Sequence, residues 1–130
     1  MTKKVVITGM GLTSPLGSSV KSAFERLHKF ENCIEYLPEL DVFENLNTRL
    51  GAKVKDFKLP DFFNRKITRT MDEVSLYAVV SAIDAITDAG LLNDEILSNG
   101  QTGVSYGSST GSINAFMDAN NSLIFTLLTP

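Results

Sequence analysis

The stretch VVITGMGLTSPLG, residues 5–17, joins three β-branched residues to a glycine-rich turn. Residues 4–9 predict a buried strand, because short β-branched runs ended by glycine are typical of strands. Residues 10–17 predict a loop, since Gly11, Pro15 and Gly17 interrupt any regular element. A strand that runs through glycines into a helix is also the outline of a dinucleotide-binding loop, so the stretch has two interpretations.

The dinucleotide-binding pattern G-x-G-x-x-G/A is matched only in part. Gly9 and Gly11 occupy the first two positions, but Ser14 stands where a glycine or alanine lets helix and strand pack closely. Glu31 and Glu35 lie near the distance expected for a ribose-binding acid, yet they follow a helix instead of a strand. A sharp turn beside packed elements explains the glycines better. A nucleotide-binding oxidoreductase domain stays open as an alternative.

Two helices are predicted from periodic apolar residues. The first begins after Ser18 or Ser19, either of which can cap it. Its apolar face consists of Val20, Ala23, Phe24 and Leu27. The second helix covers residues 71–90, with Asp72 and Glu73 at the positive end of its dipole and Gly90 as its stop. Its many alanines indicate close packing against another helix or a sheet.

The remaining segments complete an alternating order. Residues 50–54 predict a short strand, residues 102–107 a second buried strand and residues 113–121 a helix, while residues 31–48 are irregular. This order predicts an α/β layer with a mostly parallel sheet. The length of 130 residues predicts one domain.

The composition of the chain argues against several classes of protein. Twelve basic and fifteen acidic residues give a net charge of −3, which argues against nucleic-acid binding. The single cysteine, Cys33, excludes an internal disulfide and fits a reducing, cytoplasmic setting. The apolar run at residues 5–7 is too short for a signal peptide, and SLIFTLLTP near the end is too short for a membrane span.

No residue set in the chain predicts a catalytic or metal centre. Cys33 lies between two glutamates, which disfavour a thiolate, and His28 is expected to be a solvated helix residue. With one cysteine and one histidine, no metal site of three or four such ligands can form. A serine nucleophile is unsupported, because no base lies near Ser108, Ser109 and Ser112.

Four pieces of the chain, in order, resemble one family. VVITGMGLTSPLG, LNTRLGAKVKDF, NRKITRTMDEVSLYAVVSAIDAITDAGL and TGVSYGSSTGS are similar to β-ketoacyl-acyl-carrier-protein synthases of the synthase II type, within the thiolase-like group. The resemblance covers about residues 3–115. LNTRLGA and YGSSTGS resemble the synthases of aryl-polyene-type pathways. Each motif alone is modest in specificity, and their order and spacing make the signal strong.

This resemblance implies an α/β, thiolase-like fold of two βαβαβ halves, usually a homodimer without a cofactor. It implies a decarboxylative Claisen condensation between an acyl-enzyme and malonyl carried on acyl carrier protein. The family's nucleophilic cysteine and two histidines lie beyond residue 130, so we expect residues 1–130 to be an incomplete, inactive N-terminal part. The segment NSLIFTLLTP departs from the family pattern. A non-catalytic partner subunit, such as a chain-length factor, is the alternative.

The resemblance also assigns a docking turn. Arg65, Lys66 and Arg69 match the family's basic turn, which would steer an acidic carrier protein. Thr70 stands where synthase II members often carry another lysine. The alternative is that these are solvated charges, or that they pair with acidic neighbours such as Asp61 and Asp72.

The second implied site is the acyl pocket. Ser108, Thr110 and Gly111 belong to the loop GSSTGS, which matches the family loop beside the buried acyl chain. Thr110 aligns with a position that is often a larger apolar gate, so we expect it to influence which chain lengths fit. The alternative is a plain strand-to-helix turn.

Overall fold

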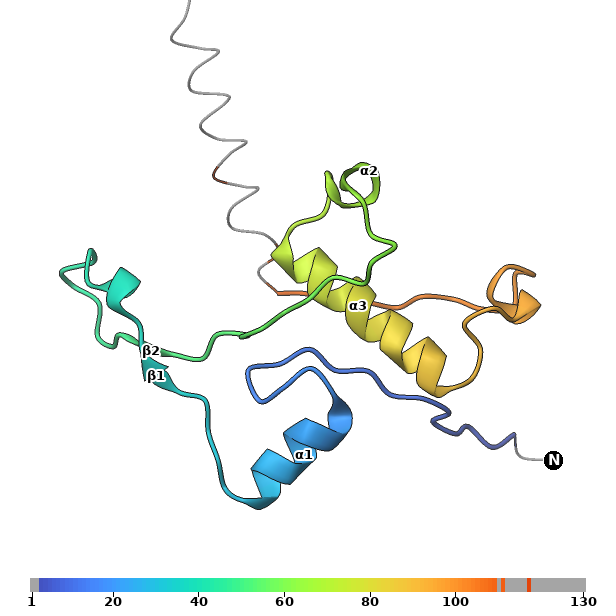
Figure 1. Cartoon of the computed structure of the whole chain (residues 1–130), viewed down its shortest axis with the longest axis horizontal. Helices are drawn as coiled ribbons and strands as arrows, with labels where there is room; N and C mark the ends of the chain where they lie inside the picture. Colours follow the sequence, from blue (N-terminus) through green and yellow to red (C-terminus); the bar gives the residue numbers. More distant parts are fainter. Residues whose placement is uncertain (1–2, 110, 112–116, 118–130) are drawn as a thin grey trace, which may run out of the picture.

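The computed structural model describes residues 3–109, 111 and 117. In Figure 1 the N-terminal loop runs between two helices, α1 and α3, with a small hairpin on one side and the short helix α2 projecting on another. The elements are α1 (Val20–His28), β1 (Glu35–Tyr36), η1 (Pro38–Leu40), β2 (Leu50–Gly51), α2 (Arg65–Thr68), α3 (Glu73–Asp88) and η2 (Glu95–Leu97).

Helix α1 begins where its capping serine predicts. The side chain of Ser19 accepts a hydrogen bond from the Ser22 amide at 3.2 Å, which confirms Ser19 as the cap. Ala23 is buried, with 2% exposed. Phe24 and Leu27, on the same predicted apolar face, keep 57% and 52% of their surface exposed. The described residues therefore cover only part of this face.

Helix α3 is also delimited by local signals. The Asp72 side chain caps it by accepting from the Ser75 amide at 2.7 Å. Gly90 has φ +73°, and the Leu91 amide reaches back to the Ile86 carbonyl at 3.0 Å, which closes the C-terminal turn. Both predicted ends are confirmed to within two residues.

The alanine-rich face of α3 packs against the glycines of the first loop. A Cβ on Gly9 would collide with the backbone of Ala85 and Ala89, and one on Gly11 with the backbone of Ser81 and Ala85. These glycines let two backbones approach more closely than any side chain permits. The predicted close packing of the alanines is confirmed, with a loop as the partner instead of a helix or sheet.

The described sheet is a single antiparallel pair. Strand β1 pairs with β2, with Glu35 opposite Gly51 and Tyr36 opposite Leu50. The predicted strand over residues 50–54 is confirmed only for its first two residues. The segment 31–48, expected to be irregular, contains β1 and the single turn η1.

Two predicted strands do not form within the part of the chain that the structure describes. Residues 4–9 and 102–107 carry no strand pairing, so the expected parallel sheet is wrong for these residues. Val5 and Val104 are 96% and 94% exposed. A β-branched run fits a pleated, half-buried surface, but a strand also needs a hydrogen-bonded neighbour, and no described residues supply one. The predicted helix at residues 113–121 falls almost entirely outside the described residues.

The end of α1 contains a strained aromatic residue. Phe30 has φ +57° and is 94% exposed, and it follows the helix in the position that usually holds glycine. We expect Phe30→Gly to raise the free energy of unfolding by about 1 kcal/mol, because it removes left-handed strain without losing buried surface. Chemical denaturation of the purified protein measures this change.

Phe30→Ala is the matched control, because alanine keeps the Cβ that causes the strain. It should leave stability near that of the original protein. Equal stabilisation by Ala and Gly would show that exposed aromatic surface, and not backbone conformation, is the source of the effect.

Candidate functional site

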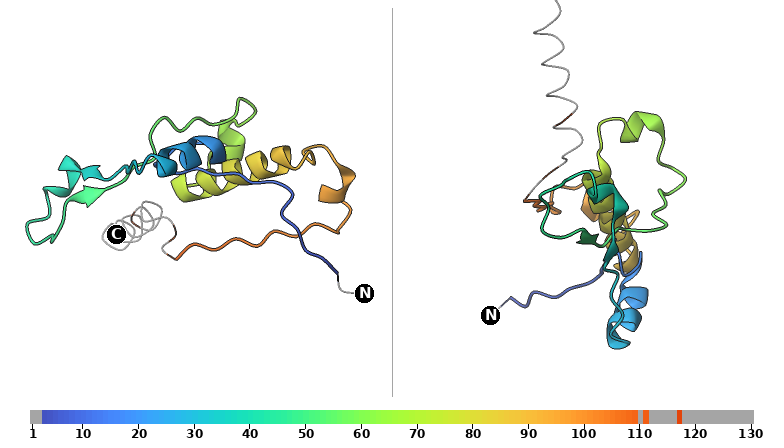
Figure 2. Two further views of the ribbon diagram at one scale, coloured as in Figure 1. Left: turned by 90° about the horizontal axis from the view of Figure 1, so that it is seen from below. Right: turned by 90° about the vertical axis from the view of Figure 1, so that its left-hand side faces the viewer.

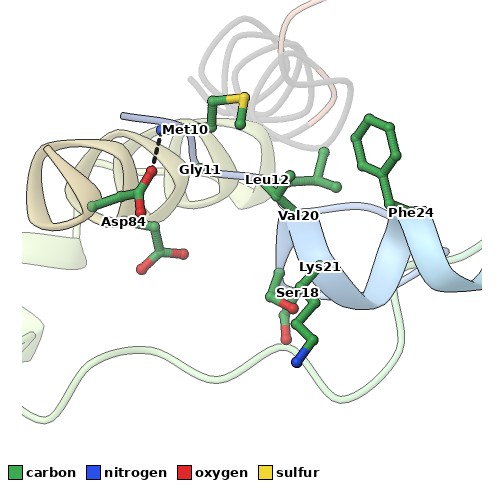
Figure 3. Close-up of a pocket in the computed structure, with 10 residues that line it drawn as sticks. Met10, Gly11, Leu12, Ser18, Val20, Lys21, Phe24 and Asp84 are labelled. Carbon is green, nitrogen blue, oxygen red and sulfur yellow. Dashed lines mark hydrogen bonds between the residues drawn. The ribbon is translucent and has the colours of Figure 1, made fainter. Parts of the chain in front are cut away.

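The first glycine turn borders an open hollow of about 640 Å³ between the start of α1 and the side of α3. Figure 3 shows Met10, Leu12 and Phe24 around it, with Asp84 on α3 close to Met10 and across from Phe24. The Met10 amide, which would be free for a phosphate in a dinucleotide loop, donates to Asp88 at 2.9 Å. The carboxylates of Asp84 and Asp88 line this hollow and repel the phosphates of a nucleotide. This arrangement argues against the nucleotide-binding alternative.

Further bonds hold this loop in place. The Ser81 hydroxyl of α3 donates to the Thr13 hydroxyl at 2.9 Å. Ser14 and Gly17 exchange backbone hydrogen bonds of 3.1 and 3.0 Å, which forms a tight turn before α1. Gly17 has φ +148°, a conformation that side chains disfavour. The loop over residues 10–17 therefore packs on α3 and leads directly into α1.

The basic turn is displayed at the surface. Arg65 and Lys66 begin α2 and Arg69 ends it, and all three are exposed. Figures 1 and 2 show α2 on a loop that projects from the N-terminal end of α3. The ion pairs among the described residues lie elsewhere, on α1 and around the hairpin. The three cations are thus presented on an exposed, projecting turn.

The segment that leads into α2 is anchored on α3 by an aromatic pair. The rings of Phe57 and Tyr77 meet edge to face, with centroids 4.7 Å apart. Burial, together with a hydrogen bond to the Glu73 carboxylate, raises the pKa of Tyr77 to about 12. The Tyr77 ring serves as a support for the segment that leads into α2.

Asn64 begins α2, and sequence periodicity does not reveal its role. Its side chain accepts from the amides of Lys66 at 3.0 Å and Ile67 at 3.2 Å. A helix of four residues has no periodic apolar face to detect. The available signal is the preference of asparagine for the N-cap position.

Cys33 has different neighbours from those its sequence suggests. Glu31 pairs with Arg26 at 2.8 Å and Glu35 with Lys55 at 2.7 Å, so both flanking carboxylates are engaged by cations. The thiol itself donates to the Pro15 carbonyl at 3.0 Å. Cys33 is thus a half-buried thiol with a backbone partner, and folding brings basic side chains to both neighbouring glutamates.

The remaining predicted residues form no catalytic arrangement. His28 is exposed on α1, with its ring 6.4 Å from that of Phe24. Ser108 and Gly111 are exposed, and the Gly111 amide donates to the Ser108 hydroxyl at 3.3 Å. Thr110 and Ser112 lie outside the described residues. Over residues 3–109, 111 and 117 we find neither a cluster of potential metal ligands nor a helix with the length and apolarity of a membrane span.

The sequence of this chain matches a known family. The family model for the N-terminal domain of β-ketoacyl synthases matches residues 2–126. The chain belongs to the β-ketoacyl synthase family. It is 37% identical over 123 residues to 3-oxoacyl-[acyl-carrier-protein] synthase 2 of Staphylococcus aureus strain N315, and 31% identical over 123 residues to the Vibrio harveyi enzyme of that name. Each alignment covers 94% of this chain and 29% of the relative.

A crystal structure supports the fold. The β-ketoacyl synthase from Burkholderia phymatum STM815 is 42% identical and superposes with a TM-score of 0.84, over 94% of this chain and 30% of that chain. The predicted α/β, thiolase-like fold is confirmed by this similarity. The chain thus spans less than a third of the length of these β-ketoacyl synthases.

Proposed function

We propose that this chain is the N-terminal part of a 3-oxoacyl-acyl-carrier-protein synthase of the synthase II type. The match over 94% of the chain to enzymes of that name carries the proposal. The complete synthase would join an acyl group, held as an enzyme thioester, to malonyl on acyl carrier protein. The new carbon–carbon bond forms as carbon dioxide leaves, and the product is 3-oxoacyl-acyl carrier protein.

Residues 1–130 alone are expected to be inactive. In the family resemblance the nucleophilic cysteine and both histidines lie beyond this stretch. The thiol of Cys33 is bonded to a backbone carbonyl, while the one histidine, His28, is exposed on α1 beside Phe24. No described pair of side chains therefore offers a nucleophile with its base.

The basic turn is the proposed contribution to carrier binding. Arg65, Lys66 and Arg69 are exposed on a turn that projects from the N-terminal end of α3. Exposed cations attract an acidic partner and can form ion pairs with its carboxylates. Acyl carrier protein appears in the printed name of the relatives and is the partner we propose.

Ser108, Thr110 and Gly111 are the proposed contribution to the acyl pocket. The support is the resemblance of GSSTGS to the family loop, with Thr110 as the residue that would limit chain length. A cytoplasmic homodimer and an aryl-polyene-type pathway are narrower proposals on the same resemblance. Because two carboxylates line the first loop, nucleotide binding is not part of the proposal.

A condensation assay tests the proposed activity. The complete synthase, given acyl- and malonyl-acyl carrier protein, should release carbon dioxide and 3-oxoacyl-acyl carrier protein in equal amounts. Mass spectrometry of the carrier protein measures the product, and residues 1–130 alone serve as the inactive control. Absence of product from the complete protein, with product restored by a second synthase subunit, would establish the chain-length-factor alternative instead.

A further inference from the structure

The basic turn has little stability of its own. Helix α2 has four residues, and a single helical turn does not offset the conformational entropy lost in forming it. The neighbouring connector is anchored by Phe57 on Tyr77, but the turn itself projects from α3. Something local must therefore hold its three cations in a defined arrangement.

Asn64 supplies the local bonds. Its side-chain oxygen accepts from the amides of Lys66 and Ile67 at 3.0 and 3.2 Å. Its backbone carbonyl accepts from the amides of Ile67 and Thr68, both at 3.0 Å, and from the Thr68 hydroxyl at 3.2 Å. The backbone of Asn64 is extended, so the chain turns into α2 at this residue.

The resulting helical turn sets the spacing of the cations. The Arg69 amide bonds to the Arg65 carbonyl at 3.0 Å, which places these two arginines one turn apart on one face. Lys66 lies one residue around the turn. If the helical turn of α2 unfolds, the three charged side chains move independently of one another. Ordering them again on binding costs free energy, which lowers the affinity for a partner.

We propose that Asn64 is a positioning residue for carrier docking, which it serves by capping the turn that carries Arg65, Lys66 and Arg69. The proposal rests on the proposed function, since it requires an acidic carrier protein as the partner. Asn64 does not touch the carrier in this role. It acts by pre-organising the residues that do.

The test compares Asn64→Ala and Asn64→Ser in the complete synthase. Alanine removes the cap, whereas serine retains a capping oxygen. For Asn64→Ala we expect the apparent KM for malonyl-acyl carrier protein to rise about fivefold, with kcat unchanged, since losing one cap changes an equilibrium by about that factor. For Asn64→Ser we expect a KM for malonyl-acyl carrier protein within about twofold of the original value.

Two further measurements separate positioning from general damage. With malonyl-coenzyme A in place of the carrier substrate, Asn64→Ala should show an unchanged KM, because that donor lacks the carrier protein. An equal loss with both donors would overturn the proposal, as would an unchanged carrier KM. The Lys66→Glu/Arg69→Glu variant is the reference. If it raises the carrier KM while Asn64→Ala does not, positioning fails and docking stands; if it has no effect, the docking function itself fails.

Discussion

Replacement of Gly11 by alanine is expected to destabilise the complete synthase by about 3 kcal/mol or to prevent its soluble expression. A Cβ at this position would overlap the Ser81 carbonyl and the Ala85 amide of α3. Both obstacles are backbone atoms inside a helix, so no side-chain rotation relieves the overlap. The loop must move away from α3, and the 2.9 Å bond between Met10 and Asp88 is then lost.

Chemical denaturation of the purified variant measures this loss of stability. Gly51→Ala is the matched control, because a Cβ there meets only the side chain of Leu37, which can rotate. The control should cost about 1 kcal/mol or less. A Gly11→Ala variant as stable as the control would contradict the close packing of the first loop on α3.

Reversal of two charges in the basic turn is expected to have the largest effect on activity. In the complete synthase, Lys66→Glu with Arg69→Glu should raise the apparent KM for the carrier-bound substrate about thirtyfold at low salt, because attraction becomes repulsion. The chemical step is distant from this surface in the proposal, so kcat at saturation should be unchanged. Steady-state kinetics at several ionic strengths measure both constants.

The salt dependence and a control variant test whether the effect of the Lys66→Glu/Arg69→Glu change comes from docking at α2. The effect should shrink as ionic strength rises, since exposed charges are screened over about 8 Å at physiological salt. Lys21→Glu with Lys29→Glu makes the same charge change at exposed sites on α1 and at its C-cap, and should leave the carrier KM near its original value. An equal rise in the control would indicate a general charge effect and not docking at α2.

Local signals predicted the ends of α1 and α3 well, whereas α2 lies in a segment expected to be a connector. Ser19 and Asp72 cap α1 and α3, and Gly90 ends α3, as their residue types indicate. These contacts join residues only a few positions apart, so the sequence contains both partners of each bond. The basic turn was assigned from the family resemblance, with solvated charges as the alternative, and its three cations are exposed in the structure.

The sequence by itself therefore determined the family, through four motifs in order, and the ends of the main helices. Only the tertiary structure decided that Gly9 and Gly11 pack against the backbone of α3. It also decided that cations pair with the glutamates beside Cys33. Finally, it left residues 4–9 without a strand partner among the described residues. The physical reason is distance along the chain. The amide of Met10 meets Asp88 across 78 residues, and strand pairing likewise depends on segments that no local pattern can bring together.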